Sequence, residues 1–63
     1  MAEWRERVRE QIAQLERQRS RLEEVRLRAQ GQGGPEGERL EAQASVRLRE
    51  IEQRIADLRF SLQ

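Results

Sequence analysis

The chain has 63 residues, which limits it to one domain. Charged residues make up 40% of the chain, the formal net charge is +1, and cysteine and histidine are both absent. This composition excludes disulfides, the common zinc ligands, histidine acid–base catalysis and cysteine nucleophiles. Because a core of this size supplies only about 3–5 kcal/mol, we expect packing against another molecule to contribute to stability.

The composition favours helices, because Arg, Glu, Gln, Leu and Ala dominate the chain and all of them have high helix propensity. Every basic residue is an arginine. No apolar run is long enough to cross a membrane, and no signal-peptide pattern opens the chain. We therefore expect an intracellular, cytoplasmic, all-α protein.

A first helix is predicted from residue 2 to residue 29, where its apolar periodicity ends at a glycine-rich segment. The segment from residue 30 to residue 35 is predicted to be a turn, since glycine stops helices and Pro35 fits the first turn of a new one. A second helix is predicted from residue 35 to residue 62. A connection this short makes the helices antiparallel neighbours, and Gly37 is expected to let the second helix fray at its start.

Apolar residues recur at alternating intervals of three and four in both helices, as in a coiled coil. The predicted core of the hairpin consists of Trp4, Val8, Leu15, Leu22, Val25, Ala44, Leu48, Ile51, Ile55, Leu58 and Leu62. Gln11 and Gln18 fall in the same rows. With the turn centred near Gly33, Leu15 is predicted to face Ile51 and Gln11 to face Ile55. The sequence thus predicts an antiparallel two-helix coiled-coil hairpin.

This core is thin, because two helices cannot enclose each other's apolar rows. A second hairpin packed face to face would form a four-helix bundle and cover them. We therefore expect a homodimer, with docking to a different helical protein as the alternative. The candidate partner-contact residues are Ile12, Leu27, Val46, Phe60, Arg5, Arg19, Arg21 and Arg47. The apolar ones among them have a second interpretation, since single exposed apolar residues are normal on protein surfaces.

Arginines are the most frequent charged residues in the positions beside the predicted core. Three interpretations remain open. Their stems can lie over the core while their guanidinium groups stay in water, they can meet acidic residues of a partner, or they can hold RNA phosphates. Neighbouring acids and the lack of interleaved aromatic residues argue against the RNA interpretation.

The sequence shows no catalytic pattern. Ser20, Ser45 and Ser61 have no histidine to activate them, and the glycine-rich segment lacks the lysine of a phosphate-binding loop. The carboxylates do not follow the spacing of a calcium loop. We therefore expect neither enzyme activity nor a cofactor or metal.

Arg54, Ile55, Leu58 and Leu62 resemble the leucine pattern of the Rho-binding helical-hairpin repeats, and the two-helix layout is similar to that of the RNA-binding Rop bundles. The Gly-Ala-Glu signature of the Rho-binding repeats is missing before the turn, and there is no residue-level match to Rop. These resemblances imply a helical hairpin and assign no family. The function predicted from the sequence is non-enzymatic self-association.

Overall fold

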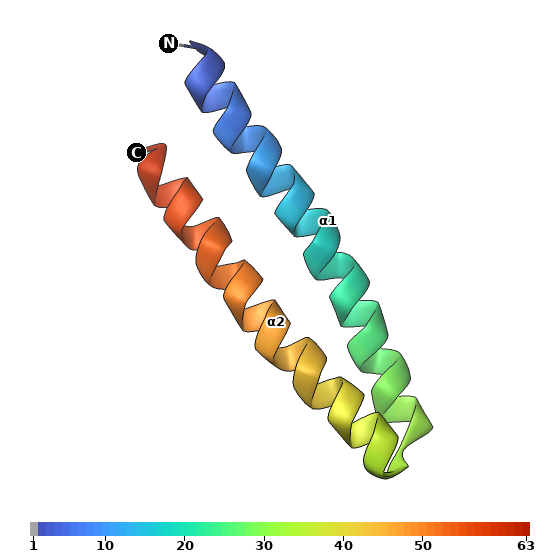
Figure 1. Cartoon of the computed structure of the whole chain (residues 1–63). Coiled ribbons are helices and arrows are strands. Elements are labelled where there is room, and N and C mark those ends of the chain that lie inside the picture. The colour runs from blue at the N-terminus through green and yellow to red at the C-terminus, as the bar shows by residue number, and fades with distance from the viewer. Residues whose placement is uncertain (1) are drawn as a thin grey trace.

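The computed structural model describes residues 2–63 as two helices, α1 (Ala2–Gln32) and α2 (Gly34–Ser61). The helices lie side by side and antiparallel, with both ends of the chain opposite the turn (Figure 1). The molecule is an elongated rod of 51 × 14 × 11 Å. The predicted antiparallel helical hairpin is confirmed. Within residues 2–63, neither helix has a stretch long and apolar enough to cross a membrane.

The break between the helices is shorter than the predicted turn at residues 30–35. The first helix continues to Gln32, and the Gly33 N–H donates to the Ala29 carbonyl at 3.2 Å. Gly33 and Gly34 adopt φ values of 71° and 70°, a region that favours glycine. The chain therefore reverses at these two residues, while Gly31 stays helical because one exposed glycine costs too little to end a long helix. Pro35 lies in the first turn of α2 as predicted.

Gly37 is a packing residue, which corrects the expectation that it loosens the start of α2. It is buried, and a Cβ at this position would lie 2.7 Å from the carbonyl oxygen of Ala29. Such a distance is closer than a carbon and an oxygen can approach without displacement. The missing side chain therefore lets the two helix backbones come together next to the turn.

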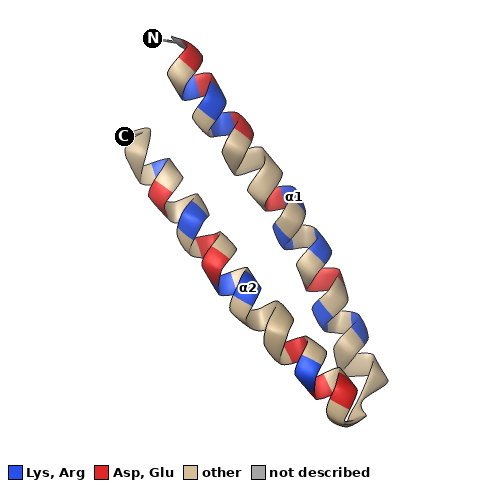
Figure 2. Cartoon of the chain, in the orientation of Figure 1, with Lys and Arg blue, Asp and Glu red and all other residues tan. Residues whose placement is uncertain are grey.

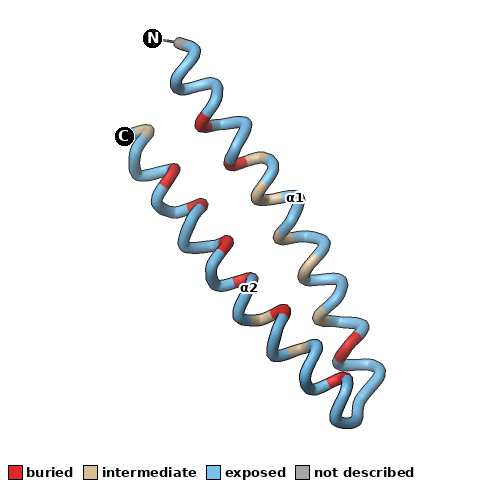
Figure 3. The backbone as a smooth tube through the Cα atoms, viewed as in Figure 1, coloured by how far each residue is buried: buried red, intermediate tan, exposed pale blue. Residues whose placement is uncertain are grey.

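The buried residues lie on the sides of the two helices that face each other (Figure 3). Its central cluster contains Val8, Ile12, Ile51, Ile55 and Leu58, with Leu15, Leu22 and Leu62 packed against it. Ala29, Ala44 and Leu48 are also buried. Nine of the eleven predicted core residues are thus buried or half-buried.

The remaining two, Trp4 and Val25, are 45% and 41% exposed, so their assignment to the core was wrong. Gln11 and Gln18, from the same predicted row, are exposed as well, and Ile12 is buried instead at 8% exposure. The first helix is therefore rotated about its axis relative to the predicted packing. Burying Ile12 removes a large apolar side chain from water and leaves both amides hydrated, which is the favourable choice.

In the observed packing, α1 directs toward α2 a row that alternates by four and three: Val8, Ile12, Leu15, Arg19, Leu22, Arg26 and Ala29. The corresponding row of α2 is Gly37, Glu41, Ala44, Leu48, Ile51, Ile55, Leu58 and Leu62. We call these two rows together the seam. All members of the seam are buried or half-buried.

Candidate interaction surface

Successive residues of a helix are about 100° apart, so the seam fixes which residues lie on each of its two sides. On one side, a groove between the helices is lined by Gln11, Gln14, Leu15, Gln18, Arg54 and Leu58. Extending the same heptad positions along both helices defines what we call the glutamine face. It consists of Trp4, Gln11, Gln18 and Val25 on α1 and of Leu40, Arg47, Arg54 and Ser61 on α2.

The glutamine face combines apolar exposure with an absence of acids. Of the large hydrophobic residues in the described part of the chain, six are exposed, and Trp4, Val25 and Leu40 are three of them, each at 41–45%. None of the eight positions is Asp or Glu. Two further hollows in the surface adjoin this face along α2, one beside Arg47 and one beside Leu40.

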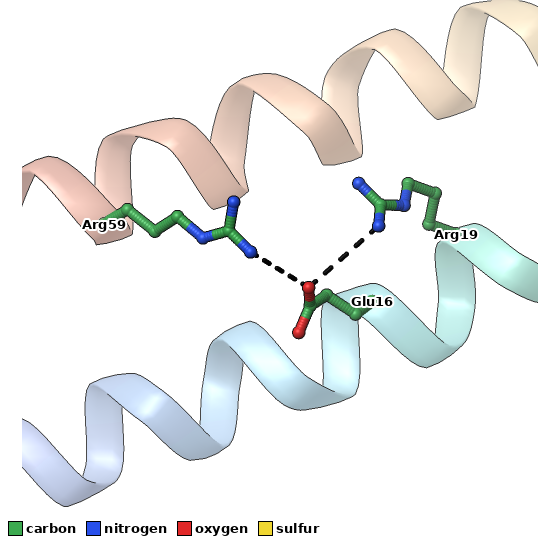
Figure 4. Close-up of polar contacts among 3 residues, drawn as sticks. All are labelled: Glu16, Arg19 and Arg59. Carbon is green, nitrogen blue, oxygen red and sulfur yellow. Dashed lines mark hydrogen bonds and ion pairs between the residues drawn. The ribbon is translucent and has the colours of Figure 1, made fainter.

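The opposite side of the seam, which we call the acidic face, is polar and internally paired. It consists of Arg9, Glu16, Glu23 and Gln30 on α1 and of Glu38, Ser45, Glu52 and Arg59 on α2. The Arg59 guanidinium donates to Glu16 at 3.0 Å across the helices, and Arg19 lies 4.0 Å from the same carboxylate (Figure 4). Gln30 donates to Glu41 at 3.1 Å near the turn. This side already satisfies part of its polar groups within the hairpin.

A third surface, the outer stripe, lies on the side of α2 that points away from α1. Arg39, Val46, Gln53 and Phe60 recur there at intervals of seven. Phe60 is 75% exposed, the most of the large hydrophobic residues that are exposed, and Val46 is 49% exposed. Leu27 is 63% exposed on the far side of α1. These three predicted contact residues are therefore accessible, whereas Ile12 is buried in the core and cannot contact a partner.

The predicted contact arginines divide into two groups. Arg5, Arg21 and Arg47 are exposed, and Arg47 lies 3.1 Å from Glu50. Arg19 is half-buried, because its position belongs to the seam. Arg26, also in the seam, is half-buried too, and its Nε is buried without a hydrogen-bond partner among residues 2–63.

Positive and negative positions alternate along both helices (Figure 2). The two edges that border the glutamine face nevertheless differ in the sign of their charges. On α1 the edge is basic and consists of Arg7, Gln14, Arg21 and Arg28. On α2 the edge is acidic and consists of Glu36, Gln43, Glu50 and Asp57. We call these the basic edge and the acidic edge. The predicted packing places these arginines beside the core but does not separate the two edges by sign, because it puts the row of Gln11 and Gln18 into the core.

Comparison with known proteins assigns no relatives. No protein-family model matches the chain, and no curated protein or solved structure matches it either. Within residues 2–63 there is no group of three or more Asp or Glu residues placed to hold a metal ion. The functional interpretation therefore rests on the surfaces of the hairpin.

Proposed function

We propose that this hairpin is a self-association module whose working form is a homodimer, in which two copies pack face to face as a four-helix bundle. The observation that supports it is the surface area of the single chain. The hairpin exposes 5150 Å² at a mass of 7.5 kDa. A compact monomer of that mass is expected to expose about 4,200 Å².

The excess of about 950 Å² is close to the roughly 800 Å² that each partner loses in a standard-size protein interface. It arises because the seam is only one row deep and the rod is 51 Å long but 11–14 Å across. Burial against a second rod of the same length would bring the area per chain to that of an ordinary small domain. The single hairpin therefore lacks a second layer of helices packed on its own two.

The small number of buried side chains supports the same proposal as the large exposed area. Among residues 3–63, eight hydrophobic residues are buried, two of them alanines, while six large hydrophobic residues stay exposed. Covering half-exposed Trp, Val and Leu side chains contributes about 25 cal/mol for each Å² of apolar surface removed from water. Self-association would bury this apolar surface with side chains that the hairpin already exposes.

The mass of the protein in solution tests the proposal. Sedimentation equilibrium at micromolar concentration should give about twice the 7.5 kDa of one chain, and the melting temperature should rise with chain concentration. A folded species that keeps the mass of a single chain at every concentration would contradict the proposed function.

A second candidate function is docking of a different helical protein on the outer stripe, which the exposure of Phe60 and Val46 favours. Aromatic side chains are enriched at binding hot spots. Phe60→Glu should then abolish capture of that partner without lowering helicity, and Leu27→Glu, at a similarly exposed position on α1, is the matched control. Loss of capture in both variants, or in neither, would contradict docking through this stripe.

RNA binding through the arginines stays a prediction, and it has less support than self-association or docking. Arg19, Arg47 and Arg59 each lie within ion-pair distance of a carboxylate, which competes with phosphate for the guanidinium group. Binding that weakens steeply with salt and depends on Arg21 and Arg47 would revive this function. No retention of single-stranded RNA at low salt would end it.

A further inference from the structure

We infer that the second copy packs on the glutamine face, with its turn at the same end of the bundle, so that α1 of each copy lies against α2 of the other. This inference rests on the proposed self-association and specifies its geometry. Three features of the hairpin support it. The glutamine face is apolar and free of acids, its side chains complement those of a second copy in this orientation, and its two edges carry opposite charges.

The glutamine face is the side of the hairpin that loses least when water is removed. It carries three half-exposed apolar side chains and no acids, whereas the acidic face carries four glutamates. Burying a carboxylate without a partner costs far more than burying an amide that finds a hydrogen bond. The groove between the helices on the glutamine face also has Leu15 and Leu58 in its lining, so its floor continues the core.

Two face-to-face arrangements have twofold symmetry. If the turns lie at opposite ends, each helix packs on its own symmetry mate. If the turns lie at the same end, each α1 packs on α2 of the second copy. In both arrangements neighbouring helices are antiparallel, so helix dipoles do not distinguish them.

The side chains of the glutamine face match when the turns lie at the same end. Gln11 and Arg54 line one groove of the hairpin, so they lie close in height along the rod, and steps of seven residues place the other members of the face in the same way. With the turns at the same end, Trp4 then lies near Ser61, Gln11 near Arg54, Gln18 near Arg47, and Val25 near Leu40 of the second copy. Each glutamine amide oxygen can accept from a guanidinium group, and the two aliphatic side chains form an apolar layer near the turns. With the turns at opposite ends, Arg47 would meet Arg54, which is repulsive.

The edges give the same answer independently. With the turns at the same end, the basic edge of one copy runs along the acidic edge of the other. In that register Arg7 lies opposite Asp57, and Arg28 lies opposite Glu36. In the reversed arrangement the basic edge would run along itself, and so would the acidic edge. Opposite charges at the rim of an interface fix its register, and like charges exclude the alternative.

Two valines provide a matched test of the face. Val25 on the glutamine face is 41% exposed and Val46 on the outer stripe is 49% exposed, so a glutamate is tolerated equally well by the single hairpin at either position. We expect Val25→Glu to weaken self-association at least about tenfold, because the new charge would face Leu40 of the second copy. Val46→Glu should change the dissociation constant less than about twofold.

The outcomes separate the two claims. If Val46→Glu dissociates the dimer and Val25→Glu does not, the interface is the outer stripe, and the inference is wrong while the proposed function stands. A wild-type chain that is monomeric contradicts the proposed function itself. Helicity by circular dichroism accompanies each mass measurement. A variant that loses helicity when it dissociates is still scored as a weakened dimer. Val46→Glu adds the same charge outside the proposed interface, so it shows whether the charge alone unfolds the hairpin.

Cross-linking tests the register. The chain has no cysteine, so a mixture of Val25→Cys and Leu40→Cys single variants can join only where the two positions meet between chains. We expect a covalent dimer from the mixture after equilibration in a glutathione buffer, and none from either variant alone. A covalent dimer from mixed Trp4→Cys and Val25→Cys variants, and not from Val25→Cys with Leu40→Cys, would place the turns at opposite ends and overturn the inference.

Discussion

The two helices share one seam but fill it differently. The seam row of α2 is apolar from Ala44 to Leu62, and its larger members are 2–9% exposed from Leu48 to Leu58. The seam row of α1 contains two arginines, Arg19 and Arg26, and its leucines, Leu15 and Leu22, are only half-buried. The second helix therefore provides most of the buried area, and the first provides most of the polar groups that a partner or solvent must satisfy.

The largest expected effect comes from the well-filled side. Ile51 is 2% exposed in the central cluster, and Ile51→Ala should lower the free energy of unfolding by about 2–4 kcal/mol, through lost apolar burial and the cavity that remains. Thermal unfolding followed by circular dichroism, at one chain concentration, measures the change.

Leu27 of α1, at 63% exposure, is the control for this substitution. Leu27→Ala should change the free energy of unfolding by less than about 0.5 kcal/mol. Equal losses in the two variants would mean that the buried row of α2 does not carry the stability assigned to it.

The same difference explains which parts of the fold the sequence could predict. In α2 the seam row is apolar without interruption from Ala44 to Leu62, so the heptad pattern determines the buried side, and all of its predicted core residues are buried or half-buried. In α1 two rows compete beside Val8, Leu15 and Leu22. One contains Gln11 and Gln18, and the other contains Ile12 with Arg19 and Arg26. Either row is compatible with helical periodicity.

Ile12 was the signal that could have decided between the rows. It is a large apolar side chain four residues after Val8, whereas Gln11 is polar, and burial of the isoleucine outweighs burial of two flexible arginine stems. The interaction surface depended on this choice. Rotating α1 exposes the row of Trp4, Gln11, Gln18 and Val25, which the heptad reading had placed inside.

The second prediction compares two glycines on either side of the turn. Gly37→Ala should lower the free energy of unfolding by about 1–3 kcal/mol, because its Cβ would lie 2.7 Å from the Ala29 carbonyl oxygen and the helices would have to move apart. Gly31→Ala should raise stability by about 0.5–1 kcal/mol, because nothing lies within 4 Å of the added Cβ and alanine favours the helix. Stabilisation by both substitutions would show that the close approach at Gly37 is not required.

The length of the turn could not be predicted from the sequence. Four glycines and a proline between residues 31 and 37 predicted a turn over residues 30–35. Only Gly33 and Gly34 use positive φ values, whereas Gly31 is an ordinary helical residue and Gly37 is a contact. Composition marks where a chain can turn, but the backbone packing between Ala29 and Gly37 decides how many residues the turn needs.

The third prediction concerns the poorly filled side of the seam. Arg26→Leu should raise the free energy of unfolding by about 1 kcal/mol, because it removes a buried Nε without a partner and extends the apolar row of α1 toward Ala29. Arg17→Leu, at an exposed position outside the seam and outside both faces, is the control and should be close to neutral. Destabilisation by Arg26→Leu alone would show that this guanidinium makes a favourable contact in the protein's working form, and a partner carboxylate would then be sought.

The smallest effect is expected for the ion pairs of Glu16 on the acidic face, one of which joins the two helices. Glu16→Gln removes the carboxylate that accepts from Arg59 at 3.0 Å and lies 4.0 Å from Arg19. Since these side chains are 35–59% exposed, water and salt screen the attraction, and the loss in unfolding free energy should stay below about 0.5 kcal/mol. The difference between the variant and the wild type should vanish at ~1 M salt, where the Debye length is about 3 Å. A larger loss that persists at high salt would mean that polar contacts on this face, and not the apolar row of α2, hold the helices together.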